Sequence, residues 1–492
     1  MPSLLLGPLL GLESDDDYTV CFLTEKSVSG ASVELDGATH TATEVKELRT
    51  GKFWRAEITI PTPSAGQWVD YEIKTNGSIT TDQTGRKNWR FWVPVAGIAP
   101  TIAYASCNGF SSADLVTKTD EPYAMWHIMK AQHEKNPFSL MIMGGDQIYA
   151  DEIWGKVKKL KKWAEQSRRD RIKQKPSKVM LGQIESFYED LYQVRWNDPI
   201  VSELLASIPS VMMWDDHDIF DGWGSYPEDL NTCPIYEAIF GIASRYFELF
   251  QIRSKINKSL LRPDENHYAF SVEFRGQHIL GLDNRAERTQ SQVMSKKQWD
   301  AVNTHLRDNI TSGNLFVLSA VPVVYRSFSF AESVLDATPW EEELTDDVKD
   351  HWRSKQHEGE RARLIMRLLE NCRKRKTTSR TVVLSGDVHI GCVGVVIDRR
   401  SPEAHMVHQI VSSGIVHPTP SRIQWLGIMA VTNDHTEYLN EDKTIEISML
   451  KPFGSDKYIR SRNFVSLAEG TDHKLWVNWV CENGKRPCFP LV

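Results

Sequence analysis

Seven short apolar runs between Pro100 and Ser413 constrain the fold more than any other feature of the sequence. The runs are TIAYAS, SLMIM, PSVMMW, HILGLD, LFVLSA, TVVLS and VHQIVS. Each is followed by a polar or glycine-containing turn, and often by a helical stretch. Short runs without strict alternation suit strands that are buried on both faces by helices, although periodicity alone does not exclude buried helix. The pattern predicts an α/β core.

The region before this core has a different pattern. Up to about Val95, alternating segments such as TVCFLTE and WRAEITIP are separated by turns at DG, TG and NG, which predicts a small β-sandwich. The segment WVPVAGIAP, with its prolines and glycine, indicates the junction. A chain of 492 residues exceeds what one hydrophobic core serves. We therefore expect two units, residues 1–95 and 96–492, with the C-terminal strands TIEISML and KLWVNWVCENG completing a second sheet.

The composition argues against a disordered protein and against a coiled coil. The chain is 41% hydrophobic and 25% charged, which is ordinary for a globular protein, and its formal net charge of -7 gives no overall attraction to nucleic acid. The opening MPSLLLGPLLGLESDDD lacks a basic leader and is expected to be a strand, and no run approaches the roughly 18 apolar residues of a membrane span. Seven cysteines without a CxxC pair fit a reducing compartment, so we expect a cytoplasmic protein.

Polar side chains of metal-binding or acid–base type follow five of the apolar runs. They are Cys107, Asp146, the segment Asp215 to His217, Asp283, and Asp387 with His389. In open α/β sheets the ligand crevice lies outside the carboxyl ends of the strands. The sequence therefore predicts a site where these strands end.

Two glycine-containing turns carry the first candidate ligands. In GGDQIYADE a carboxylate follows two glycines, so Asp146 could bridge two cations, although a lone Asp after a strand is commonly only a turn or cap residue. SGDVHIG places Asp387 and His389 one residue apart, and we expect a bend permitted by Gly386 to aim both at metal. Carboxylate with imidazole suits transition metals, beside a calcium or magnesium site.

The segment MMWDDHDIFDGWG is the densest candidate, with Asp215, Asp216, His217, Asp218 and Asp221 within seven positions. So many carboxylates repel one another unless cations or hydrogen bonds neutralise them, which favours metal binding over a surface turn. Imidazole has the right pKa range to donate a proton to a leaving alkoxide. The alternatives are that His217 is a neutral, hydrogen-bonded side chain and that Asp218 caps a turn.

Cys107 in YASCNGF is the least specific of the candidates, because a lone cysteine is by default a small buried hydrophobe. Its place at a strand end favours a ligand role. A thiolate together with the phenolate of Tyr149 favours trivalent iron over zinc.

Together these motifs resemble one known family. YASCNG, GGDQIYADE, WDDHDIFDGWG, LDNRAERT and LSGDVHIG occur in the order typical of the PhoD-like alkaline phosphatases, a branch of the calcineurin-like metallophosphoesterases. The resemblance covers roughly Pro100 to Ser413. It implies an α/β (α+β) fold in which a β-sandwich is flanked by helices, with a small N-terminal all-β domain.

The resemblance also implies a metal centre of two or more ions. Cys107, Asp146, Tyr149 and His389 would hold iron(III), Asp146 would bridge to calcium, and Asp387 would belong to the calcium side. Manganese, zinc and magnesium are the alternative metals.

Two positions depart from the pattern of the family. Asp221 stands where the founding branch has an asparagine, which makes this metal ligand anionic. Asn284 stands where a threonine commonly precedes the arginine. Arg285 and Arg288 remain to hold a phosphate, and surface ion pairs are the alternative for both.

The sequence therefore predicts a phosphoric-ester hydrolase. Metals would lower the pKa of a bound water to about 7, and the hydroxide would attack phosphorus in line. His217 would protonate the leaving alcohol with Asp216 orienting its ring, while Arg285 would hold the non-bridging oxygens. Alkaline phosphatase and phosphodiesterase activity share such a centre. The alternatives are a metal-containing binding protein without activity, or a phosphodiesterase for a polyanionic or lipid substrate.

A basic segment bears on the substrate. Lys156 to Lys178 carries eleven Lys and Arg against Glu165 and Asp170. One interpretation is the wet face of a helix whose apolar stripe is Val157, Leu160, Trp163 and Ala164. The other is a funnel for a polyanionic phosphate ester, and nucleic acid is expected only as such a substrate.

Overall fold

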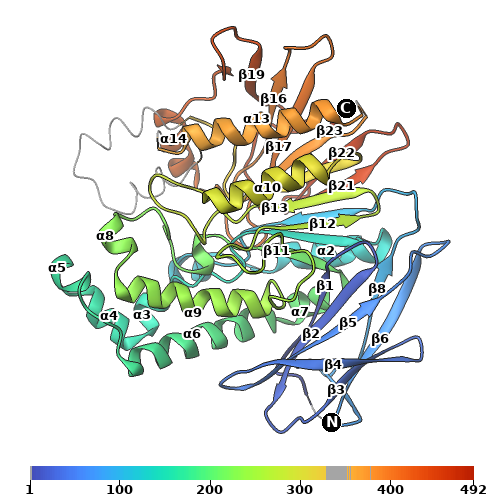
Figure 1. Cartoon of the computed structure of the whole chain (residues 1–492), viewed down its shortest axis with the longest axis vertical. Helices are drawn as coiled ribbons and strands as arrows, with labels where there is room; N and C mark the ends of the chain where they lie inside the picture. The colour runs from blue at the N-terminus through green and yellow to red at the C-terminus, as the bar shows by residue number, and fades with distance from the viewer. Residues whose placement is uncertain (1–2, 328–351, 353, 355, 377, 492) are drawn as a thin grey trace.

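Two large β-sheets form the centre of the molecule in the computed structural model, which describes residues 3–327, 352, 354, 356–376 and 378–491 (Figure 1). One cluster of buried apolar side chains includes Ile142 of the first sheet and Phe316 of the second, so the sheets pack face to face. The neighbours of Phe316, Leu315 and Val317, belong to another cluster with the helices outside the second sheet. The predicted α/β sandwich flanked by helices is confirmed.

The first sheet has a parallel centre built from the first three apolar runs. Its strands are β9 (Ile102–Ala105), β10 (Leu140–Gly144) and β11 (Ser210–Met213), and every residue in them is buried. The opening segment is a strand as expected, β1 (Leu6–Leu12), and it pairs in parallel with β11. Near-continuous apolar runs suit this position because both faces of the sheet are covered.

The N-terminal region is all-β, as the alternating pattern predicts. It consists of β2 (Asp17–Glu25), β3 (Ala31–Leu35), β4 (Ala38–Glu47), β5 (Gly51–Thr59), β6 (Gln67–Thr75), β7 (Ser78–Thr80) and β8 (Asn88–Val93). Because β2 pairs with β1, hydrogen bonding runs unbroken from this region into the central sheet (Figure 1). The division into folding units at residue 95 stays a prediction.

The second sheet contains the remaining apolar runs. Its parallel strands are β13 (Gln277–Gly281), β14 (Asn314–Leu318), β15 (Thr381–Ser385) and β17 (His405–Val411). Antiparallel strands extend it, namely β12 (Phe270–Phe274), β16 (Gly391–Asp398), β18 (Glu437–Tyr438), β19 (Ile445–Leu450) and β20 (Tyr458–Ile459).

The C-terminal strands divide between the two sheets, which corrects the expectation that they complete the second sheet alone. TIEISML forms β19 in the second sheet. KLWVNWVCENG supplies β22 (Leu475–Cys481), which joins the first sheet with β21 (Asn463–Glu469) and β23 (Cys488–Leu491). The strand β21 pairs with β9, so it gives the parallel centre of that sheet an antiparallel border.

Helices surround the sandwich (Figure 1). Those beside the first sheet are α2 (Ala124–Lys135), α6 (Lys178–Trp196), α7 (Pro199–Ser207) and α9 (Pro234–Phe250), whereas α10 (Lys296–Asp308) and α13 (Glu358–Lys374) pack on the second. Shorter helices are α1 (Ala113–Lys118), α8 (Glu228–Asn231) and α14 (Arg422–Val431). In the parts of the chain with described coordinates, no helix is both long and apolar enough to cross a bilayer.

The basic segment is not one helix. It forms three short helices, α3 (Ile153–Lys156), α4 (Lys158–Ala164) and α5 (Arg168–Arg171), followed by α6. Val157, Leu160 and Trp163 of the predicted stripe are buried, whereas Ala164 is exposed. The apolar stripe thus anchors the segment, and most of its cations project into solvent, whereas the half-buried Arg171 packs over the Trp163 ring.

Candidate metal centre

The candidate ligands converge where strands of both sheets end. Cys107 follows β9, Asp146 follows β10 and Asp387 follows β15. A bridge between Ser106 and Gly414 joins the two sheets at this edge. The structure thus brings together side chains that lie up to 282 positions apart, from Cys107 to His389.

Five of the predicted ligands have left-handed backbone conformations. Their φ angles are 53° at Cys107, 56° at Asp146, 52° at Tyr149, 64° at Asp387 and 54° at His389. Such angles are uncommon for residues other than glycine and cluster at functional sites, where the surrounding structure must enforce them. Each strand therefore ends in a sharp turn that changes the direction of the ligand.

The bend in SGDVHIG is made differently from our expectation. Asp387 and His389 themselves adopt the left-handed conformation, whereas Gly386 does not. A Cβ atom on Gly386 would lie 2.3 Å from the Ser106 hydroxyl oxygen, so the glycine is needed for the close approach of two strand ends. The glycine permits packing rather than the bend.

One ligand group combines sulfur, oxygen and nitrogen. Cys107, Asp146 and His389 place one ligand atom each within 4.8 Å of one another. The Cys107 thiol donates a hydrogen bond to Asp146 Oδ2 at 3.5 Å, and the Tyr149 hydroxyl lies 3.1 Å from His389 Nε2. Cys107 and Tyr149 are completely buried.

Further ligand groups adjoin this one and consist mainly of carboxylates. Asp146 also groups with Asp216 and His217, and Asp216 groups with Asp215 and Asp387, again within 4.8 Å. Asp146 is therefore shared between the sulfur-containing group and an adjacent one. Asp221 belongs to none of the groups among the described residues, and its Oδ1 lies 3.9 Å from His217 Nε2.

The electrostatics of this cluster are unfavourable without a cation. Burial and then the carboxylate of Asp215 raise the pKa of Asp146 well above its usual value, and burial with Asp146 raises that of the Cys107 thiol. Burial followed by His417 lowers the pKa of His389 well below its usual value. The buried Asp146 Oδ1 has no hydrogen-bond partner among the described residues. The donor set therefore fits bound metal, which would compensate these costs.

His217 has a different orienting partner from the one predicted. Its Nδ1 lies 2.9 Å from Asp151 Oδ2, whereas Asp216 Oδ2 accepts a hydrogen bond from the Gly222 amide at 2.8 Å. Burial alone would lower the pKa of His217, but Asp151 and then Asp216 raise it well above its usual value. The prediction that Asp216 orients the ring is wrong in this respect, because Asp151 occupies that position.

Arg285 is placed against carboxylates. Its completely buried guanidinium forms an ion pair with Asp215 through Nε and lies 3.3 Å from Asp216 Oδ1. It also donates to the Trp223 carbonyl oxygen at 3.1 Å. Arg285 thus forms a buried ion pair with carboxylates, whereas the sequence suggested either a surface ion pair or a contact with the phosphate of the substrate. Arg288 is also buried, with its NH2 group 3.4 Å from His357 Nδ1.

Sequence reasoning missed two residues of this region. Asp151 stands in the GGDQIYADE motif, so its spacing was a usable signal. His417 stacks on His389 with ring centroids 3.7 Å apart, and nothing in its local sequence indicated this. Asp218, which the sequence suggested as a turn cap, does cap a short turn, but it is buried and accepts four hydrogen bonds in all, although burial raises its pKa to about 7.

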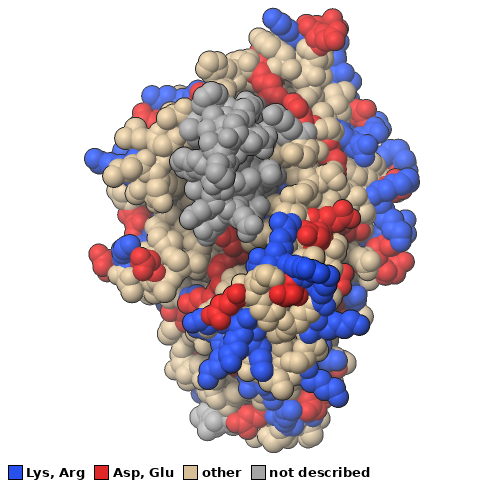
Figure 2. Space-filling view, turned by 90° about the vertical axis from the view of Figure 1, so that its left-hand side faces the viewer, with Lys and Arg blue, Asp and Glu red and all other residues tan. Residues whose placement is uncertain are grey.

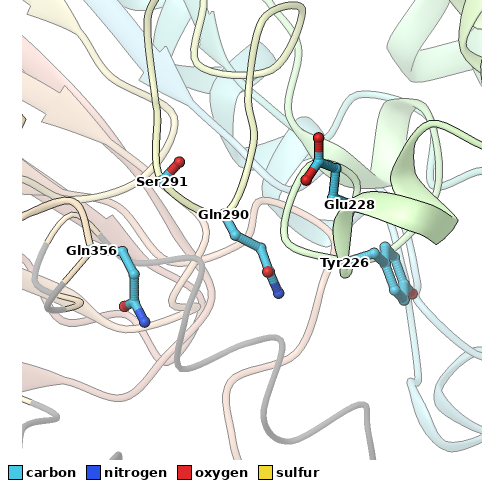
Figure 3. A pocket seen from close by; sticks show the side chains of 5 residues that line it. All are labelled: Tyr226, Glu228, Gln290, Ser291 and Gln356. Carbon is cyan, nitrogen blue, oxygen red and sulfur yellow. The ribbon is translucent and has the colours of Figure 1, made fainter.

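Tyr226 lines a small polar pocket of about 290 Å³ (Figure 3). Its lining residues carry hydroxyl, amide or carboxylate groups, and they are Tyr226, Glu228, Gln290, Ser291 and Gln356. The Tyr226 hydroxyl donates to the Asp221 carbonyl oxygen at 2.9 Å. The pocket is thereby connected to the loop that carries His217.

Two solved structures share the fold described above. A solved structure of PhoD has a TM-score of 0.62 at 16% identity, covering 99% of this chain and 88% of that one. A purple acid phosphatase from yellow lupin (Lupinus luteus) seeds has a TM-score of 0.54 at 12% identity, covering 98% and 73%. At these identities the likeness shows the fold.

Sequence comparison identifies the family. An uncharacterized protein of Saccharomyces cerevisiae is 27% identical over 425 residues, which is 73% of this chain and 58% of that protein. The chain thus spans less than two thirds of the length of this relative. The model of a family described as PhoD related phosphatase matches residues 88–340 and 337–445. The chain therefore belongs to the PhoD-related phosphatase family.

Proposed function

We propose that the protein hydrolyses phosphate esters with metal ions held by the ligand groups around Asp146. The observation that carries this proposal is that one buried carboxylate is shared by two adjacent ligand groups, with an imidazole beside it. When bound, such ions lower the pKa of a coordinated water and screen the phosphoryl oxygens.

The ligand types favour different metals on the two sides. Cys107, Tyr149 and His389 offer a thiolate, a phenolate and an imidazole, which suit iron(III). Asp216 and Asp387 offer hard carboxylate oxygens, which suit calcium or magnesium. We propose iron and calcium, with manganese, zinc and magnesium as alternatives that metal analysis distinguishes.

We propose His217 as the proton donor to the leaving alcohol. Asp151 holds Nδ1, so Nε2 is left to carry the proton that is transferred. Against the effect of burial, the neighbouring carboxylates of Asp151 and then Asp216 raise the pKa of the imidazole, which favours its protonated form. Asp216 contributes charge to this arrangement, and Arg285 keeps Asp215 and Asp216 in place as a positioning residue.

A metal-binding protein without activity is the rival proposal. In a site without activity, His217 would act only as a ligand with Asp151 fixing its ring, whereas in a catalytic site the same pair supplies an oriented proton donor. A loss of activity in a His217 variant that depends on the leaving group distinguishes the two proposals.

The exposed cations of the basic segment favour an anionic substrate. Among the described residues, Lys156 and Arg168 alone of the eleven cations form ion pairs, with Glu152 and Asp229. The helices α4 and α5 lie at the left of Figure 1, and Figure 2, which views the molecule from that side, shows blue side chains gathered there. We propose that this surface attracts a polyanionic phosphodiester and that the polar pocket receives the alcohol part of the substrate. A cytoplasmic location stays a prediction.

The test is hydrolysis of p-nitrophenyl phosphate and bis-p-nitrophenyl phosphate before and after treatment with a chelator. We expect activity to vanish with the metal and to return when iron and calcium are restored together. Preference for the second ester would identify a phosphodiesterase. Activity that survives complete metal removal, or no activity on either ester at full metal content, would contradict the proposal.

A further inference from the structure

The carboxylate of Asp218 is one of the points at which two ligand-bearing segments meet, and the Ala150 amide, which donates to the His217 carbonyl oxygen at 2.6 Å, is another. Its Oδ1 accepts hydrogen bonds from the amides of Gln147 at 2.9 Å and Ile148 at 3.2 Å. Its Oδ2 accepts from the Asp215 amide at 3.0 Å, and Gln251 Nε2 donates to Oδ1 at 3.2 Å. Asp218 is 2% exposed, so these donors take the place of water.

The two amides on Oδ1 lie inside a strained turn. Asp146 and Tyr149, which flank them, both have left-handed backbone conformations. Left-handed residues other than glycine persist only where neighbouring groups enforce them. The Asn108 amide holds the turn from the other side, by donating to the Asp146 carbonyl oxygen at 2.7 Å. The carboxylate therefore supplies the second half of a clamp on residues 146–149.

A capping role alone does not explain these contacts. Asp218 does close a short 3₁₀ turn by accepting from the Asp215 amide. The amides of Gln147 and Ile148 come from the end of another strand, 70 or more positions earlier in the chain. A cap needs only the first contact, whereas the others join the Asp146 turn to the loop that carries His217.

We propose that Asp218 is a positioning residue that fixes the Asp146–Tyr149 turn against the Asp215–His217 loop, so that ligands from both segments meet at one centre. The inference rests on the proposed function for its catalytic consequence, because Asp218 acts through Asp146 and Tyr149. Its structural consequence, protection of the turn, holds without metal.

The experiment compares Asp218→Asn with a matched control, Glu189→Gln. Glu189 is also completely buried and accepts from two backbone amides of a distant segment, Arg49 at 3.1 Å and Thr50 at 2.6 Å. It lies outside the metal centre, so it reports the cost of altering a buried clamp as such. Gln251→Leu, which removes one donor to Asp218, is a milder variant should Asp218→Asn fail to fold.

Three quantities are measured in the full chain: metal affinity by chelator competition, kcat and KM on bis-p-nitrophenyl phosphate, and hydrogen exchange of residues 145–150 in metal-free protein. We expect Asp218→Asn to weaken metal binding and to lower kcat by roughly 10- to 100-fold, with KM changed less than about threefold. Exchange of residues 145–150 should accelerate at least tenfold, and about threefold in Gln251→Leu. Glu189→Gln should change none of these.

Unchanged exchange in both Asp218→Asn and Gln251→Leu would overturn the inference. So would equal losses of metal affinity in Asp218→Asn and Glu189→Gln, because the effect would then be general destabilisation. If the wild-type chain binds no metal, the proposed function fails, and hydrogen exchange alone decides the role of Asp218.

Discussion

Left-handed residues occur both at hairpin tips of the N-terminal β-region and at the metal centre, but for different physical reasons. Asp36 and Asn76 have φ angles of 48°, are exposed, and are each followed by glycine. Cys107 and Tyr149 have φ angles of 53° and 52° and are completely buried. The comparison teaches that local chemistry makes the first kind of turn, whereas tertiary contacts enforce the second.

Asn76 and Tyr149 show the difference. Asn tolerates the left-handed region well by itself, and the contacts of Asn76 Oδ1 with the amides of the distant Ser29 at 2.9 Å and Gly30 at 3.3 Å only add to this tolerance. Tyr149 has no such intrinsic tolerance. The surrounding structure holds Tyr149 in this strained conformation, and the turn thereby directs ligands toward one point. Substitutions at the hairpin tips should therefore lower stability without lowering activity. Substitutions of the ligands should lower activity with little loss of stability.

The largest expected effect comes from removing a ligand without straining the backbone. Glycine suits the left-handed conformation, so His389→Gly should lower kcat/KM by roughly a thousandfold, or about 4 kcal/mol, with little loss of stability. The matched Asp36→Gly at a hairpin tip should leave kcat/KM unchanged. Steady-state kinetics and thermal unfolding measure both. A His389→Gly variant that keeps its activity would contradict this contrast between the metal centre and the hairpin tips.

The next largest effect is expected at His217, the proposed proton donor. His217→Asn should lower kcat by roughly a hundredfold on an alkyl phosphate ester, because the departing alkoxide needs a proton. The loss should be much smaller with p-nitrophenolate, which leaves without one. Asp151→Asn should show the same dependence on the leaving group, more weakly. Equal losses on both ester types would indicate a metal-binding role for His217 instead.

A buried histidine beside the N-terminal region should affect stability in acid. Burial and then Arg90 lower the pKa of His133 to about 4, with Glu203 opposing, and its Nδ1 accepts from the Phe138 amide at 3.0 Å. The unfolded chain binds the proton nearer pH 6.5, so stability falls as the pH drops from 6.5 toward 4. His133→Asn should remove about 2 kcal/mol of the destabilisation between pH 7.5 and pH 5, measured by urea unfolding. The same pH dependence in the variant would contradict this.

The smallest expected effect is at a hairpin tip. Asn76→Ala should cost about 1 kcal/mol, because alanine tolerates the left-handed conformation poorly and the contacts to Ser29 and Gly30 are lost. Denaturant unfolding measures this cost, and hydrolysis should be unaffected. If Asn76→Ala lowered activity without lowering stability, the hairpin tip would affect the metal centre, and the contrast between the two regions would be wrong.

The sequence predicted what depends on local pattern. The apolar runs predicted the buried strands, and the DG and NG pairs predicted hairpin turns. The strand-end positions predicted most of the side chains that meet, but Asp283 belongs to none of the ligand groups among the described residues and accepts hydrogen bonds from Trp214 and Tyr268 instead. Spacing did not show that β1 joins β11, since that pairing links residues about 200 positions apart. It also did not show that Asp151 rather than Asp216 holds His217, because Asp151 lies in another motif, 66 positions before His217.

The most direct test of the shared Asp146 carboxylate is elemental analysis of the chain purified without chelator, beside Asp146→Ala. Iron, calcium, zinc and manganese are quantified per chain, with circular dichroism to verify that the variant is folded. We predict a transition metal together with a hard cation in the wild type, and loss of both in Asp146→Ala, because its carboxylate belongs to adjacent ligand groups. A wild-type chain without metal, or a variant that retains its full metal content, would contradict the account.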